Sequence, residues 1–497
     1  MQNNKTIHVS LRFYFSAAIG IFGAMYYRNR TILAKIPMIL ELTLLFLLVV
    51  TTNIYADIHY VRAGATGTES GNDWTNAYIM LPATLVRGDT YYLSGGIYAD
   101  YSFDDVESGT QYIFIKKATI GSHGTNTGWN DLYASSVAQI GSIKFFTGYY
   151  DIDGVTGGGP GGWTSGFGIK VYGGGVGGKV VNILGSFVNG LRFRHIEFEH
   201  DQGRDSHNSS EHIFYGPIYS GSNHAANDVV VQYCYLHDVS GCMFITNVWS
   251  NVTLEYSKVA RNGYSVVGID SIHREAWSAI GDDNVIIRYN IFEDISNTAV
   301  IAIVNNGGGN VSDRWELYGN VFVKNTLDNS HVSSLMVLGY DNTMTISNWK
   351  FYNNSIINMS GSTMNSGAGV QVNCVAFNNL YYNNTGNAVG PQYFTHDYSF
   401  FSGNIRTEGC TTSCDLDPDA AASEVHGQDS SGDPFVDWVN GDYRLKTSTN
   451  AGMSLPSPYN TDMNGNTRGA DGLWDRGAYE FKRVILIPKT PSDILIH

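Results

Sequence analysis

The chain is poor in charged residues and in cysteine. Charged side chains make up 15% of its 497 residues, and five cysteines are scattered along it. These cysteines are too few for the disulfide framework that stabilises small secreted domains. The 30 basic residues are outnumbered by 45 acidic ones, and the resulting formal charge of −15 argues against nucleic acid and anionic membrane surfaces as partners. An acidic polysaccharide stays open, because a local basic cleft can lie on an acidic protein.

Several catalytic motifs are also missing. The sequence has no His and Cys spacing for zinc, no phosphate-binding loop and no nucleophile elbow. Cys234 and Cys242 fall in strand-like runs and are predicted to be buried. Cys410 and Cys414 lie in a loop and could pair in an oxidising compartment. Any chemistry must therefore rest on other residue types.

Glycine and tyrosine are abundant instead. The chain contains 56 Gly and 32 Tyr, a composition of tight turns and aromatic strands. Aromatic surfaces with little charge suit the rings of sugars.

A unit of two short strands recurs six times between residues 229 and 384. Each unit has a β-branched and aromatic strand, a polar residue that breaks it, and a second short strand, as in residues 285–295. The apolar residues that mark the second strand are Leu236, Val259, Phe292, Phe322, Ile356 and Tyr381. Their steps of about 23 to 34 residues are typical of a stacked repeat architecture.

No helical period separates these strands, which excludes a fold with crossover helices. The remaining arrangement is a coil of parallel strands, with successive coils stacked about 4.8 Å apart around a long core. We predict that the first five markers form one inward column. We also predict an asparagine ladder at the bend between strands, with left-handed backbone at its members, which are Asn290, Asn320, Asn354 and Asn379.

The Tyr-Asn-Ile-Phe-Glu-Asp pattern of residues 289–294 and its copies resemble the pectate-lyase-like superfamily. Other segments resemble the ends of secreted bacterial β-helix proteins: residues 60–64, 71–77 and 95–98 near the start, and residues 433–437, 441–445, 462–468 and 474–480 near the end. The resemblance covers about residues 57–482. It implies an all-β, right-handed parallel β-helix with an N-terminal cap and a C-terminal cap of short strands.

Better known members of this superfamily are polysaccharide lyases and glycosidases, although a fold does not fix a function. Its lyases use a Lys or Arg base with Ca²⁺, which makes Ca²⁺ a candidate cofactor. Their catalytic positions do not align with this chain, so no family residue is carried over.

The chain divides into five predicted parts. Residues 1–56 read as a signal peptide with an apolar region at 38–50. The earlier apolar stretch of residues 13–27 is either a membrane anchor, or translation begins within it, at Met25. Residues 57–100 form the N-terminal cap and first coil, in which residues 76–86 have a helical spacing. The β-helix spans 101–406, a C-terminal loop and cap span 407–482, and a tail spans 483–497. The glycine-rich residues 157–178 read as a flexible loop, either a lateral excursion or a lid over the substrate.

Strand alternation places a set of polar side chains on the outer wall. If the marker residues point inward, the outward set includes Glu197, Glu199, His237, Lys258 and Glu293, and stacking aligns Glu199, His237, Ala260 and Glu293 in one column. Polar residues on such a wall are more often simply solvated. The insertions at residues 201–228 and 262–275 flank these coils, and insertions on one face of a repeat often build its binding surface.

The candidate catalytic residues are His237, Arg261, His273, Arg274 and Glu275. A lyase acting on a uronate needs a cation that neutralises the carboxylate, a base of near-neutral pKa and an acid for the leaving oxygen. His237 or His273 could be the base, and Arg261 or Arg274 the cation. The candidate substrate-binding residues are Lys258, Asp238 and Glu293.

We therefore expect a monomeric, secreted or cell-surface protein that acts on an acidic polysaccharide by β-elimination. One alternative is a carbohydrate-binding or adhesin-like protein without catalysis. Another is a glycoside hydrolase, in which Glu275 with Asp282 or Asp283 supplies two carboxylates about 5 to 9 Å apart.

Overall fold

The computed structural model describes residues 56–216, 218–219, 222–223, 225–263, 274–295, 297–304, 311–325, 332–339, 344–359, 362–365, 370–384, 394–403 and 424–482. A compact unit begins at Asp57. The predictions for the leader before Ala56, for His273, for Cys410 and Cys414, and for the tail 483–497 lie outside the described residues. Within the described part, no helix is long and apolar enough to cross a membrane.

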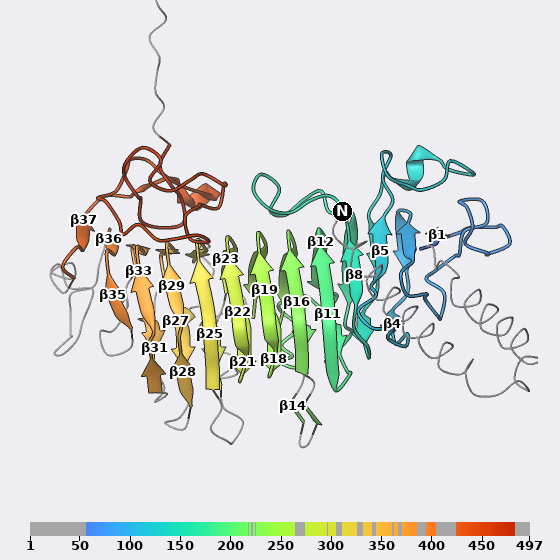
Figure 1. Cartoon of the computed structure of the whole chain (residues 1–497), viewed down its shortest axis with the longest axis horizontal. Helices are drawn as coiled ribbons and strands as arrows, with labels where there is room; N and C mark the ends of the chain where they lie inside the picture. The colour runs from blue at the N-terminus through green and yellow to red at the C-terminus, as the bar shows by residue number, and fades with distance from the viewer. Residues whose placement is uncertain are drawn as a thin grey trace, which may run out of the picture. The chain divides into compact units, whose positions relative to one another are not determined.

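The protein is a right-handed parallel β-helix, as predicted, and each coil passes through three long parallel sheets (Figure 1). Sheet A contains β1 (Ile58–Val61), β2 (Thr90–Leu93), β5 (Ile113–Lys117), β8 (Tyr150–Asp153), β11 (Phe187–Arg194), β16 (Ala225–Gln232), β19 (Ser250–Glu255), β22 (Asp283–Arg288), β25 (Val311–Tyr318), β28 (Thr345–Ser347), β29 (Lys350–Tyr352), β32 (Val370–Val372), β33 (Val375–Phe377) and β35 (Thr395–Asp397). Sheet B contains β3 (Gly96–Tyr98), β6 (Ala138–Ile140), β9 (Ile169–Gly173), β12 (Ile196–His200), β17 (Tyr235–Val239), β20 (Lys258–Asn262), β23 (Ile291–Glu293), β26 (Val321–Val323), β30 (Ser355–Ile357), β34 (Leu380–Tyr382), β36 (Phe400–Ser402) and β37 (Gln428–Ser430). Sheet C contains β4 (Tyr101–Phe103), β7 (Ile143–Phe145), β10 (Lys179–Ile183), β13 (His212–Tyr215), β18 (Phe244–Asn247), β21 (Trp277–Ile280), β24 (Asn297–Ile303), β27 (Val332–Leu338) and β31 (Ser362–Asn365).

The predicted inward column is confirmed. Leu236, Val259, Phe292, Phe322 and Ile356 are direct register partners on successive strands of sheet B. Each is at most 1% exposed, so one alternate set of side chains fills the core. The rings of Phe292 and Phe322 stack with their centroids 5.0 Å apart, which continues the spacing of the coils into the side chains.

The asparagine ladder is also confirmed, but its backbone differs from the prediction. Asn290 donates from its backbone amide to Asn320 Oδ1 at 3.0 Å, and Asn320 and Asn354 repeat this contact one and two coils further on. The left-handed residue is the one before each ladder residue: the φ angle is 57° at Tyr289 and 52° at Asn353. The side-chain amide of each ladder residue therefore lies inside the bend, where it bonds buried backbone groups.

The helical segment predicted for residues 76–86 is wrong. These residues contain no helix. Pro82 lies in the middle of the segment and breaks any helix there. Other backbone amides of the segment bond to distant partners instead: that of Leu85 donates to Asp105 Oδ1 at 2.6 Å, and that of Tyr78 donates to the carbonyl of Tyr60 at 2.9 Å. The apolar spacing reflects burial of Leu81 and Leu85 against the first coils.

Two predicted irregular segments contain regular strands. The glycine-rich residues 157–178 are interrupted by β9, so the loop proper is shorter and spans residues 154–168. The predicted insertion 201–228 contains β13 and the small antiparallel hairpin of β14 (Ile218–Tyr219) and β15 (Ser222–Asn223). Strong local glycine and polar content masked these strands in the sequence. A short 3-10 helix, η1 (Asp131–Tyr133), lies between β5 and β6.

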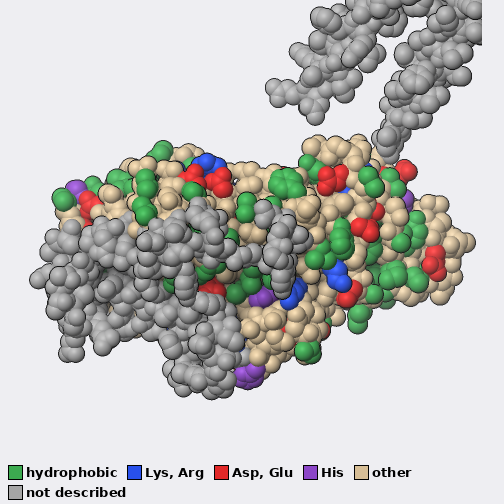
Figure 2. Space-filling view, turned by 90° about the horizontal axis from the view of Figure 1, so that it is seen from below, with side chains coloured by type: hydrophobic (Ala, Val, Ile, Leu, Met, Phe, Trp, Pro, Cys, Tyr) green, Lys and Arg blue, Asp and Glu red, His purple; other side chains and the backbone are tan. Residues whose placement is uncertain are grey.

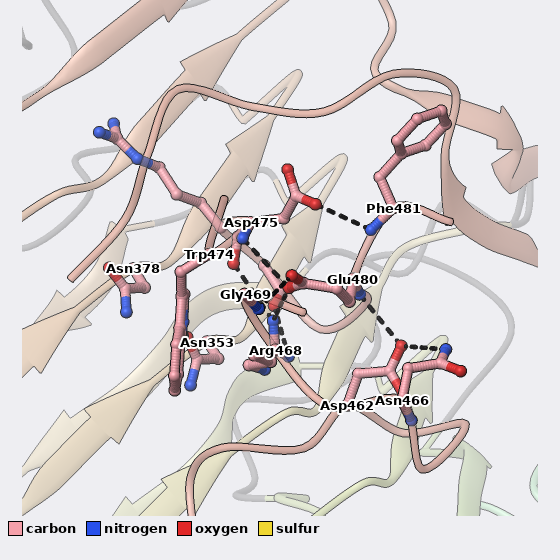
Figure 3. Close-up of polar contacts among 12 residues, drawn as sticks. Asn353, Asn378, Asp462, Asn466, Arg468, Gly469, Trp474, Asp475, Glu480 and Phe481 are labelled. Carbon is pink, nitrogen blue, oxygen red and sulfur yellow. Dashed lines mark hydrogen bonds and ion pairs between the residues drawn. The ribbon is translucent and has the colours of Figure 1, made fainter. Parts of the chain in front are cut away.

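The C-terminal cap consists of β38 (Phe435–Asp437), the 3-10 helix η3 (Trp438–Asn440) and β39 (Asp442–Leu445), followed by irregular chain. The two strands are antiparallel, with Gly441 left-handed at φ 85° between them. The irregular part docks on the coils through Trp474 Nε1, which donates to Asn353 Oδ1 at 3.1 Å (Figure 3).

Inside the irregular part, Glu480 accepts from the backbone amides of Gly469 at 2.6 Å and Asp475 at 3.1 Å (Figure 3). Burial raises the pKa of Glu480 to about 7.

Candidate functional site

The outer face of sheet B carries two neighbouring columns of side chains. In the first, Lys170, Glu197, Tyr235 and Lys258 are successive register partners. In the second, the partners are Tyr172, Glu199, His237, Ala260 and Glu293, which confirms the column predicted from Glu199 onward. We call Lys170, Tyr172, Glu197, Glu199, His237, Asp238 and Arg261 the sheet-face cluster.

Lys170 joins the two glutamates of the cluster. Its Nζ lies 2.8 Å from Glu197 Oε1 and also contacts Glu199 Oε2. The two carboxylates are about a quarter exposed, at 24% and 25% of their side chains. Lys170 therefore fixes both carboxylates while leaving part of each open to solvent.

His237 is held between two carboxylates. Its Nδ1 lies 2.7 Å from Asp238 Oδ2 and its Nε2 lies 3.2 Å from Glu197 Oε1. Arg261 completes the group, because its Nε and Nη2 donate to the two oxygens of Asp238 at 2.9 and 2.6 Å. This bidentate pairing fixes the plane of the carboxylate that faces the imidazole.

The pairing decides the charge states. Burial works against ionisation of His237, but the hydrogen bonds to Asp238 and Glu197 outweigh it and raise the pKa of the imidazole. Burial also opposes ionisation of Asp238, yet Arg261 and His237 hold the pKa of that carboxyl well below its usual range. The carboxylates at both ring nitrogens favour the charged form of His237, which makes it a poor candidate for a free base.

Two aromatic rings border the charges. Tyr235 stacks on His237 with ring centroids 3.9 Å apart and is itself covered by Phe167 from the glycine-rich loop. Tyr172 is half-buried, and Lys170 Nζ lies 5.1 Å from the centroid of its ring. Tyr172 is therefore the aromatic surface that the cluster offers to a ligand.

The predicted substrate-binding residues Lys258 and Glu293 pair with each other instead. Lys258 Nζ lies 2.8 Å from Glu293 Oε2, and both side chains are only 14% exposed. Tyr443 of the C-terminal cap donates its hydroxyl to the same Glu293 oxygen at 3.3 Å. Glu293 therefore contacts the cap and Lys258 holds Glu293, whereas the third candidate, Asp238, belongs to the cluster.

Arg274 and Glu275, two of the predicted catalytic residues, are buried at the start of the strand that enters sheet C. They are 1% and 0% exposed. The backbone carbonyl of Arg274 accepts from Asn262 Nδ2 at 2.6 Å, and that of Glu275 accepts from the amide of Met243 at 3.3 Å. The structure therefore brings the buried His237 and the partly exposed Arg261 together on the sheet B side but places Arg274 and Glu275 in the interior.

Neither carboxylate pair considered for hydrolysis, Glu275 with Asp282 or Glu275 with Asp283, shares an accessible face, because Glu275 is buried. Asp282 is fully buried, accepts the hydroxyl of Thr246 and the amide of Trp249, and burial raises its pKa to about 7. Asp283 lies outside and contacts Arg314. Asp282 therefore satisfies buried donors, and Asp283 forms an ion pair at the surface.

Glu197, Glu199 and His237 bring potential metal ligands within 4.8 Å of one another. They do not fit the candidate cofactor Ca²⁺, which prefers six to eight oxygen ligands. Here Lys170 contacts both glutamates and His237 Nε2 already bonds Glu197, so the atoms that would bind a metal are occupied by one another and by a cationic side chain.

One face of the described surface is electrostatically mixed. On the face shown in Figure 2, basic and acidic side chains form small mixed groups among the residues drawn in colour. That part of the described surface offers no broad basic area for a polyanion.

Comparison with protein-family models finds no match, and no curated protein matches the chain. The site must therefore be interpreted from its own chemistry. Sequence reasoning missed Lys170 and Tyr172, because their coil precedes the recognisable repeat. The signal that could have found them is the alternation in residues 169–173, where Lys170 and Tyr172 alternate with the apolar Ile169 and Val171.

Proposed function

We propose that the protein binds a polysaccharide on the outer face of sheet B, at the sheet-face cluster. The observation that carries this proposal is the register pair of Tyr172 and Glu199 beside Lys170. An aromatic ring packs against the C–H face of a sugar, and fixed carboxylates accept its hydroxyl groups. Flat rings bordered by a few oriented polar groups are the usual composition of small-molecule sites.

The pairing within the cluster favours binding over proton transfer. Lys170, His237 and Arg261 each face at least one carboxylate, so the polar atoms are held in position before a ligand arrives. Such preorganisation lowers the entropy lost on binding. The same pairing raises the pKa of His237, which disfavours a role as a base.

The test is calorimetric titration of the purified protein with a panel of neutral and uronic-acid oligosaccharides. We expect binding by at least one class, and a loss of about tenfold in affinity for Tyr172→Ala and for Glu199→Gln. Tyr112→Ala is the control, since Tyr112 is also half-buried but precedes a strand of sheet A. Equal affinity in all three variants, or no binding by the wild type, would refute the proposal.

A second candidate function is β-elimination on an acidic polysaccharide, as the resemblance to the pectate-lyase-like superfamily implies. The observation that favours it is Arg261, whose side chain is 34% exposed beside the imidazole of His237. Arg261 would neutralise the uronate, the quarter-exposed carboxylate of Glu199 would accept the proton from the carbon next to it, and His237 would donate a proton to the leaving oxygen as the carbon–oxygen bond breaks.

Ultraviolet absorbance separates the two functions, because β-elimination creates an unsaturated product and binding does not. If the protein is a lyase, a uronic-acid polymer gains absorbance with the wild type, and Arg261→Ala and His237→Ala each slow the reaction by a factor on the order of 10². Binding without any absorbance change rules this candidate out. Either function fits the secreted or cell-surface location that we propose from the leader.

A further inference from the structure

The loop of residues 154–168 is built to hold one shape. Gly158 and Gly159 adopt φ angles of 74° and 72°, and they pack directly on Tyr233 of the neighbouring coil. A Cβ at Gly158 would lie 2.0 Å from the Tyr233 carbonyl oxygen, so only glycine fits there. His195 Nδ1 contacts the carbonyl of Gly157 at 2.7 Å, and Phe167 anchors the other end of the loop on Tyr235.

The tip of this loop reaches the C-terminal cap. Figure 1 shows the loop above the upper ends of β12, β16 and β19, next to the cap at the end of the chain. Trp163 packs against the apolar cluster that contains Tyr443 and Tyr479. Two segments far apart in the sequence therefore meet over the same edge of the β-helix.

A pocket of about 220 Å³ lies where they meet. Its loop side is lined by Pro160, Gly161 and Trp163, and its cap side includes Asn440, Asp442, Arg444 and Asn464. Arg444 donates to both oxygens of Asp442, at 2.8 and 2.5 Å, which fixes a planar group of donors and acceptors. The side chain of Arg444 is still 61% exposed and can meet a ligand.

We infer that this pocket is a second glycan subsite, which takes a single sugar ring between Trp163 and the polar edge of the cap. Pockets for drug-sized ligands hold roughly 300 to 1,000 Å³, so a smaller one suits one ring. The indole offers an apolar face, while Asp442, Arg444 and Asn464 offer both acceptors and donors for hydroxyl groups. The ligand class rests on the proposed function, but the site is separate from the sheet-face cluster.

The test uses the full chain and the same oligosaccharide panel. Trp163→Ala removes the ring. Asn464→Ala removes a side-chain amide from the pocket. Among the described residues this side chain makes no hydrogen bond, so the variant tests the pocket without loosening the loop of residues 154–168. Trp438→Ala is the control, because Trp438 is on the same cap but packs against Tyr382. Thermal unfolding of each variant checks the fold.

We expect Trp163→Ala and Asn464→Ala each to weaken binding about tenfold, with affinity unchanged in Trp438→Ala. If the wild type binds and Tyr172→Ala weakens it, but Trp163→Ala and Asn464→Ala do not, the pocket is only a contact between loop and cap and this inference is wrong. If the wild type binds no member of the panel, both this inference and the proposed function fall.

Discussion

The asparagine ladder and the sheet-face cluster are both columns of polar side chains produced by stacking of coils, yet they differ in one respect. The ladder repeats the same residue from coil to coil, at Asn290, Asn320, Asn354 and Asn379, and all four are 0% exposed. The outer column changes at every coil, from Tyr172 to Glu199, His237 and Ala260.

The difference follows from what each column must satisfy. The coils at Asn290, Asn320, Asn354 and Asn379 present the same buried backbone groups at the bend, so the same side-chain amide satisfies them each time, and Ser257 takes this position one coil before Asn290. The outer wall has no such repeated requirement, because its polar groups find different side-chain partners in different coils, as His237 does in Asp238 and Glu197. Repetition in a β-helix therefore marks structure, and a departure from repetition on a half-exposed face marks a candidate for function.

The largest effect is expected in the ladder. The Asn320 side chain accepts from Asn290 at 3.0 and 3.1 Å and donates to Ile287 at 2.8 Å and Asn354 at 3.1 Å. Asn320→Ala leaves buried groups without partners, and we expect it to lower the free energy of unfolding by about 3 to 5 kcal/mol, measured by denaturant titration.

The control for this variant is Asn373→Gly. Asn373 also bonds an asparagine one coil away, Asn348 at 3.3 Å, but that contact is exposed. Glycine keeps its left-handed φ of 55°. If the free energy of unfolding falls by more than about 1 kcal/mol in Asn373→Gly, or does not fall in Asn320→Ala, burial does not decide how much an asparagine ladder stabilises the fold.

The cap extends the comparison to a buried group that ionises. The ordinary pKa of a Glu carboxyl is 4.5, and that of Glu480 in the folded chain is about 7. Between these values the folded state binds the proton more tightly than the unfolded state, so this contribution to stability is lost as pH rises from about 5 to about 7. Its size is on the order of 3 kcal/mol.

Glu480→Gln should remove this contribution. We expect thermal unfolding between pH 5 and pH 8 to show a wild-type melting temperature that declines relative to that of the variant as pH rises. The difference in melting temperature between the two proteins removes the contribution of Asp282, which titrates in both. Parallel pH profiles would show that the Glu480 carboxyl is not raised.

A smaller effect is expected inside the sheet-face cluster. Asp238→Asn removes the charged partner that raises the pKa of His237, and burial, which acts in the opposite direction, then dominates. We expect the His237 pKa, followed by NMR of the ring protons, to fall below that of the wild type. A value that does not change would mean that the raised pKa of His237 depends on Glu197 alone.

The sequence predicted the repeat well because both of its signals are local. Alternation gave the sides of Glu199 and His237, and the spacing of Leu236 to Ile356 gave the register. The ladder was found, but its left-handed residue was misplaced by one position, since Tyr289 is bulky and is not a residue expected at positive φ.

The rest depended on packing that single-sequence patterns do not contain. Arg274 and Glu275 look like surface residues in an insertion, but the chain turns inward there. The cap contact of Tyr443 with Glu293 joins residues 150 positions apart. Nothing in the local pattern around Lys258 or Glu293 indicates that they are covered.

The central claim is that the repeated column maintains the fold and the varied column binds the ligand. The most direct measurement compares Glu199→Gln and Asn320→Ala in oligosaccharide affinity and in thermal stability, at a temperature where both are folded. We expect Glu199→Gln to lose about tenfold in affinity with a stability change within about 0.5 kcal/mol, and Asn320→Ala to lose stability with its affinity retained. The opposite assignment, or equal losses of affinity in both variants, would contradict the account.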